Sequence, residues 1–218
     1  MTTTFDFQDG NGPVPAHQHP NGGGWVADTA RVTETAIVGP DARVFGNARV
    51  YDSAHVSDKA CVYGDARVYG KAHVYGTSRV YGDARVYGNA QVYGDARLYG
   101  SARVHDYAWV FGNARVYDNS QVYHDARVYA DARVSSNTRV SGNAWVSGNA
   151  WLYGTARVYD DAHVVDEHAT STAPSKIYAL LSVHYYALQG IFATRIGAEE
   201  AQGKLDFPTI ITEWEVES

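Results

Sequence analysis

A six-residue repeat is the feature of this chain that most constrains its fold. Val or Leu occupies every sixth position from Val26 to Val164, which makes 24 hexads, and a small residue usually follows four positions later. The commonest unit reads Val-Tyr-Gly-Asp/Asn-Ala-Arg. This period fits neither a helix nor an array of hairpins. It predicts an all-β solenoid in which each hexad supplies one short strand and one corner, with Val and the small residue inside.

The Val-x-x-x-Ala-x pattern resembles the left-handed parallel β-helix of the hexapeptide-repeat superfamily, over about residues 24–167. The Tyr-Gly-Asn-Ala-Arg version looks like bacterial and prophage-encoded members whose activity is mostly unassigned. The resemblance implies triangular coils of three hexads, hence about eight coils, and homotrimers with parallel axes. Most members with a known activity are acyltransferases that use acetyl-CoA or acyl carrier protein. Others are γ-type carbonic anhydrases or non-catalytic scaffolds.

The sequence predicts three parts. Residues 1–23 read as an irregular N-terminal lid, and residues 24–169 form the β-helix. Residues 170–218 predict a small α/β appendage. Its helix would follow Ser175 and end at Gly190, and its strands would be Ile191–Ile196 and Thr209–Val216.

With three hexads to a coil, residues 18 apart lie in columns. The sequence therefore predicts which side chains lie on each of the three faces. The side chains before and after each Val point outward, because strand side chains alternate. Two faces carry mostly Arg beside Tyr, whereas the third is aromatic and has one Arg. Protein interfaces favour aromatic residues and are depleted of charge at their core. The residues expected in a subunit interface are His55, His73, Trp109, Phe111, Trp145 and His163.

Two histidines are the candidate catalytic residues. His105 and His124 should lie about one coil apart, and Asp106 and Asp125 follow them. A carboxylate can orient a histidine that acts as a general base. The alternative is that both are surface substitutions, with His in place of a Tyr and a Gly. The hexads contain no inserted loop, so no residue matches the superfamily's catalytic histidine by motif.

Other histidines suggest metal or pH-dependent contacts. His17 and His19 form an HxH segment that would bind a metal if three copies met at an axis. His55 and His73 should stack on adjacent coils, where with His163 they would contact a metal or make a pH-sensitive trimer contact.

Charge and composition limit the partners. The net charge of −6 argues against a generic nucleic-acid binder. The Arg and Tyr columns leave nucleic acid or an acidic glycan as a less favoured ligand, because corner Asp residues are expected to pair with many Arg. A single cysteine, Cys61, excludes an intrachain disulfide. No secretory signal or apolar membrane span is expected. A cytoplasmic bacterial protein is therefore predicted, or a virion-associated one if a phage encodes it.

These observations favour a non-catalytic trimeric β-solenoid that serves as a rigid interaction or structural module without a cofactor. Its C-terminal appendage would engage a protein partner. The residues expected in that contact are Tyr185, Tyr186 and Trp214. The alternative is an acyltransferase with a site between subunits, for which acetyl-CoA would be the cofactor.

Overall fold

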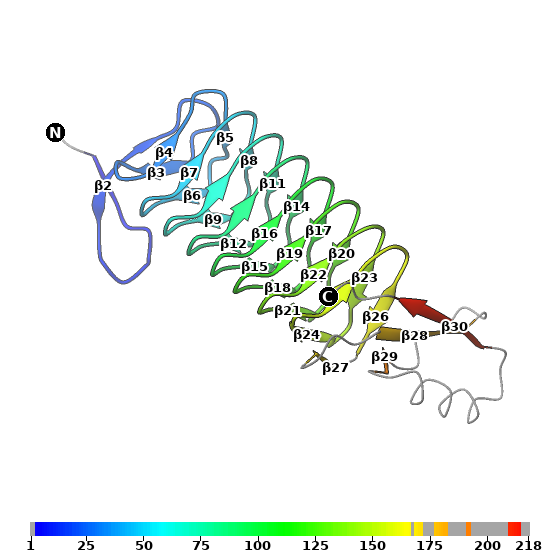
Figure 1. Ribbon diagram of the computed structural model, residues 1–218. Helices are drawn as coiled ribbons and strands as arrows, with labels where there is room; N and C mark the ends of the chain where they lie inside the picture. The colour runs from blue at the N-terminus through cyan, green and yellow to red at the C-terminus, as the bar shows by residue number, and fades with distance from the viewer. Residues whose placement is uncertain (1–2, 167, 172–176, 183–190, 193–208, 215–218) are drawn as a thin grey trace.

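The computed structural model describes residues 3–166, 168–171, 177–182, 191–192 and 209–214. Within these residues every regular element is a β-strand, and no helix long and apolar enough to cross a membrane is found. The repeat region winds as a parallel solenoid of about eight coils (Figure 1). The all-β solenoid predicted from the repeat is confirmed.

Three parallel sheets form the sides of the solenoid. The first face contains β3 (Trp25–Ala27), β6 (Arg43–Val44), β9 (Cys61–Val62), β12 (Arg79–Val80), β15 (Arg97–Leu98), β18 (Arg115–Val116), β21 (Arg133–Val134), β24 (Trp151–Gly154) and β27 (His168–Ser171). The second face contains β4 (Arg31–Val32), β7 (Arg49–Val50), β10 (Arg67–Val68), β13 (Arg85–Val86), β16 (Arg103–Val104), β19 (Gln121–Val122), β22 (Arg139–Val140) and β25 (Arg157–Val158). The third face contains β5 (Ile37–Val38), β8 (His55–Val56), β11 (His73–Val74), β14 (Gln91–Val92), β17 (Trp109–Val110), β20 (Arg127–Val128), β23 (Trp145–Ser147) and β26 (His163–Val165).

The register of these sheets is set by the repeat. Arg67 lies opposite Arg49 on one side and Arg85 on the other, so residues 18 apart are neighbours. Backbone hydrogen bonds run from coil to coil, as where the Tyr69 N–H donates to the Val86 carbonyl at 3.0 Å. Each outward position therefore repeats as a column along one face.

The core is narrow and made of small side chains. Every repeat Val or Leu from Val38 to Leu152 is 0% exposed, as is the small residue of each hexad between them. Where Ser replaces Ala, its hydroxyl donates to a nearby carbonyl, at 2.8 Å from Ser78 to Tyr75. Burying a Val side chain contributes about 1.5–3 kcal/mol, and the repeat multiplies that contribution along the rod.

The corners need residues that tolerate a positive φ. Gly94 has φ of 68°, and a Cβ there would lie 2.9 Å from the backbone nitrogen of Gly112 in the next coil. Asp takes the same backbone conformation at other corners. At Asp58 the carboxylate oxygen Oδ2 accepts a hydrogen bond from the Gly76 N–H at 3.0 Å, which links successive corners.

The N-terminal cap is more regular than the sequence predicted. Strands β1 (Thr4–Phe5) and β2 (Val14–Gln18) form an antiparallel hairpin, and β2 pairs antiparallel with β3. Phe7 is 4% exposed and stacks on Phe45 with ring centroids 4.9 Å apart. The expected irregular lid is wrong here, because the cap continues the first face and occupies the hydrogen-bonding edge of β3.

The C-terminal residues depart from the predicted helix. Strand β28 (Ile177–Ser182) pairs antiparallel with β29 (Ile191–Phe192) and β30 (Thr209–Trp214). The helix is therefore wrong for 177–182, since a short apolar run of this kind suits either structure until its pairing is known. The remainder of that helix, 183–190, lies outside the described residues. The described parts of the two predicted strands are β29 and β30. The remaining residues of those predictions, 193–196 and 215–216, lie outside the described residues.

Candidate functional site

The third face carries a ladder of Trp109, Arg127, Trp145 and His163, called the Trp–Arg ladder below. The guanidinium carbon of Arg127 lies 5.0 Å from the Trp109 ring centroid and 5.1 Å from that of Trp145. The Trp145 ring then stacks on His163 at 4.7 Å. Strands β17, β20, β23 and β26 hold these side chains in register. Trp145 is 36% exposed, so the ladder presents an aromatic surface to solvent.

A second aromatic column runs beside the ladder. Phe111 stacks on Tyr93 and on Tyr129, with ring centroids 4.9 Å apart in both pairs. The structure thus places Trp109, Phe111, Trp145 and His163, all predicted as interface residues, on one continuous face. Whether a second copy covers this face stays a prediction.

His55 and His73 stack on the N-terminal part of the same face, as predicted. Their ring centroids are 4.6 Å apart. Burial, and to a lesser extent the neighbouring His55, lowers the pKa of His73. His163 lies at the other end of the face, on β26, so the structure does not bring the three histidines together.

His105 and His124 are brought together by one carboxylate. Asp106 Oδ1 lies 3.2 Å from Nδ1 of His105, and Asp106 Oδ2 lies 3.9 Å from Nε2 of His124. Burial raises the pKa of Asp106, but hydrogen bonds from His105 and from the His124 N–H outweigh it, and the net pKa is lowered. The His105 ring also stacks between Tyr87 and Tyr123.

Asp106 has a structural role as well. It adopts a positive φ, and its Oδ2 accepts a hydrogen bond from the backbone N–H of the same corner in the next coil, at 3.3 Å. Asp52, Asp58 and Asp118 do the same at other corners. The contact between Asp106 and His124 therefore belongs to the corner geometry of the solenoid. Asp125, the other predicted carboxylate partner, makes no ion pair within the described residues.

The His17 and His19 rings of the HxH segment contact different partners and do not face a common metal position. His17 Nδ1 lies 2.9 Å from Asp28 Oδ1 and is exposed. His19 is 3% exposed, and its Nδ1 accepts the Asn21 N–H within its own loop. Among the described residues, no group of three or more His, Cys, Asp or Glu side chains is arranged to hold a metal.

The arginine columns differ from their predicted pairing. Within the described part of the chain, the ion pairs with carboxylates all involve histidine, so the expected Arg–Asp pairs are wrong. Asp residues that take the Gly position of the corner, such as Asp52, accept backbone N–H groups instead. The Tyr stacks are present, with Tyr51, Tyr69 and Tyr87 spaced 4.8 Å apart.

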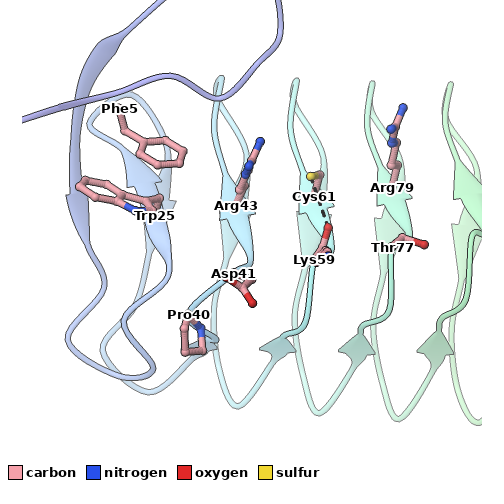
Figure 2. A pocket seen from close by; sticks show the side chains of 9 residues that line it. All are labelled: Phe5, Trp25, Pro40, Asp41, Arg43, Lys59, Cys61, Thr77 and Arg79. Atoms are coloured by element: carbon pink, nitrogen blue, oxygen red, sulfur yellow. Dashed lines mark hydrogen bonds between the residues drawn. The ribbon is translucent and has the colours of Figure 1, made fainter.

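A shallow pocket that the sequence analysis missed lies at the N-terminal end of the first face. Its volume is about 490 Å³. Figure 2 shows Arg43 and Arg79 on either side of Cys61, on three consecutive strands. The sequence contains a feature that could have predicted this pocket. Cys61 replaces the Arg that the surrounding hexads place in this column. The other residues lining the pocket are Phe5, Trp25, Pro40, Asp41, Lys59 and Thr77.

The predicted partner-binding residues lie at the C-terminal end of the chain. Tyr185 and Tyr186 lie outside the described residues. Trp214 is the last residue of β30. The proposed contact of the appendage with another protein stays a prediction.

The coil geometry and the outward columns together define the chain as a parallel β-solenoid protein. Comparison with known families agrees with this class. Six segments match the family described as the YdcK Beta solenoid repeat, at residues 42–58, 60–76, 78–91, 90–106, 108–124 and 138–154. The repeat region of the chain is therefore similar to this β-solenoid repeat family. No curated protein matches the chain.

Proposed function

We propose that this protein is a rigid, non-catalytic β-solenoid module that associates with two further copies of itself through its third face. The Trp–Arg ladder is the observation that supports this most strongly. It presents aromatic rings and one delocalised cation on four successive coils, and Trp145 is exposed.

Self-association through this face follows from its chemistry. Trp and Arg are the residues most enriched at the energetic centres of interfaces. The third face has one Arg where the second has seven, so copies meeting at the third face bring fewer like charges together. The resemblance to hexapeptide-repeat proteins favours three copies around a parallel axis over two.

An acyltransferase is the second candidate, and one observation favours it. Asp106 lies 3.2 Å from Nδ1 of His105, which leaves Nε2 of that ring to act as a general base. The same carboxylate is used for the corner hydrogen bond to His124, as at other corners, and this weakens the catalytic interpretation. Titration with acetyl-CoA by calorimetry tests the candidate. Saturable binding, together with acyl transfer that His105→Ala abolishes while binding is kept, would favour the enzyme.

The molar mass in solution, measured by light scattering after size-exclusion chromatography, tests self-association. The full chain should have three times the monomer mass of 23.8 kDa. Trp145→Ala should shift the protein towards monomer, because truncating a central interface Trp costs about 2 kcal/mol or more.

Trp151→Ala is the matched control. Trp151 is the same residue type, is 37% exposed against 36% for Trp145, and lies one hexad later on the first face. It should leave the trimer intact. A monomeric wild-type chain, or equal loss of mass in both variants, would contradict an interface on the third face.

A further inference from the structure

The pocket on the first face exists because one residue interrupts a column of arginines. The outward position before the buried Val or Leu is an arginine at Arg43, Arg79, Arg97 and Arg115. In the strand between Arg43 and Arg79 the same position is Cys61. Adjacent strands lie about 4.8 Å apart, so Arg43 and Arg79 leave the sheet about 9.6 Å apart. The short Cys61 side chain leaves the space between them open (Figure 2). This space is part of a pocket of about 490 Å³ that Phe5, Trp25, Pro40, Asp41, Lys59 and Thr77 also line.

The walls of the pocket are cationic. Arg43, Lys59 and Arg79 line it against a single carboxylate, Asp41. Within the described residues, no Asp or Glu forms an ion pair with any of the three cations. Their charges are therefore not neutralised by a carboxylate at hydrogen-bonding distance, and an anion entering the pocket meets two guanidinium groups and one ammonium group.

The N-terminal cap holds one side of the pocket in place. Nη1 of Arg43 donates to the Phe7 carbonyl at 3.2 Å and to Oε1 of Gln8 at 3.0 Å. The Arg43 guanidinium also lies over the Phe5 ring, 5.6 Å from its centroid. Phe5 stacks on Trp25 at 4.4 Å, and the two rings form an apolar wall. A preorganised cation beside an apolar wall is the arrangement that small-molecule sites use.

The floor of the pocket is uncharged. Burial raises the pKa of the Cys61 thiol above its ordinary value, although Arg43 and Arg79 oppose this shift. The thiol also donates to the Lys59 carbonyl, with sulfur and oxygen 3.7 Å apart. Cys61 therefore remains a neutral thiol near pH 7 and does not repel an anion.

We propose that this pocket binds a small organic phosphate whose phosphoryl group sits between Arg43 and Arg79. The flat apolar body of the ligand lies against the wall of Phe5 and Trp25. Two guanidinium groups on opposite sides suit a phosphoryl group, which offers acceptor oxygens in several directions.

Phenyl phosphate is the probe, titrated into the full-length protein by calorimetry. The wild-type chain should bind it with a saturable heat, and inorganic phosphate should bind more weakly because it lacks the apolar body. Arg79→Gln should weaken binding at least tenfold, since it removes a charge-assisted hydrogen bond. Arg115→Gln, in the same column two coils beyond Arg79, should leave affinity unchanged.

Cys61→Arg separates the pocket from general attraction to the arginine column. It restores the Arg of the repeat, fills the pocket and adds a positive charge, so it should abolish saturable binding. Cys61→Ala keeps the pocket open and should keep the affinity, which also guards against a folding defect in the first variant. The proposal is overturned if Cys61→Arg binds as tightly as wild type, or if the wild-type chain shows no saturable heat.

Discussion

The second and third faces of the solenoid share one backbone plan but present different surfaces. Both consist of eight parallel strands in register, and both bury Val and small residues behind those strands. Outside, the second face repeats Arg beside Tyr, whereas the third carries histidines and the Trp–Arg ladder. The inward positions thus determine the fold, and the outward positions are free to specify contacts. Three predictions test this division.

The largest effect is expected from the shared core. Val86→Ala on the second face and Val110→Ala on the third each remove two methyl groups from a side chain that is 0% exposed. Each should lower the free energy of unfolding by about 2 kcal/mol, from lost transfer free energy and the cavity left behind. Urea denaturation followed by circular dichroism measures both. A difference above about 1 kcal/mol between them would show that the two faces do not share an equivalent core.

A smaller effect is expected from the outward cation of the third face. Arg127→Gln removes a guanidinium held between two Trp rings and should cost about 0.5–1 kcal/mol of the free energy of unfolding. The matched change on the second face is Arg139→Gln, an exposed Arg in the equivalent outward position. It should cost almost nothing. Urea denaturation of both variants and of the wild-type chain, at one protein concentration, distinguishes them. Equal losses in the two variants would show that the ladder does not stabilise the fold.

The smallest effect is expected from His73, whose pKa is lowered in the folded protein by burial and by His55. Because the unfolded chain binds the proton first, the free energy of unfolding should fall as the pH drops below 6.5, the ordinary pKa, and should not change through this group above it. Denaturation midpoints from about pH 7.5 to about pH 5 measure the slope. His73→Gln should make it shallower, and an unchanged slope would show that His73 does not contribute.

The repeat predicted the solenoid because its period is unambiguous. A Val at every sixth position fixes which side chains are buried, and the columns of each face follow from three hexads per coil. The number of hexads per coil came from the resemblance to hexapeptide-repeat proteins. Given that number, the period predicted the stacking of His55 on His73 and the placement of Trp109 and Trp145 on one face.

The ends and the pocket were not predicted, because each depends on a contact that the repeat does not encode. The antiparallel pairing of β2 with β3 joins segments of different composition. The strand at Ile177–Ser182 is recognisable as a strand only through its pairing with Thr209–Trp214. The Arg–Asp pairs were expected from charge alone. In the structure, corner carboxylates such as those of Asp52 and Asp58 accept hydrogen bonds from backbone N–H groups of the next coil.

The central claim is that the third face joins copies of this protein and the second does not. Replacing Trp109 and Trp145 together by Arg gives the third face the outward chemistry of the second and leaves every buried residue unchanged. Light scattering measures the molar mass of this double variant, with circular dichroism to check its fold. The account predicts a folded monomer of about 23.8 kDa where the wild-type chain has three times that mass. A folded double variant that keeps the trimer mass would contradict it.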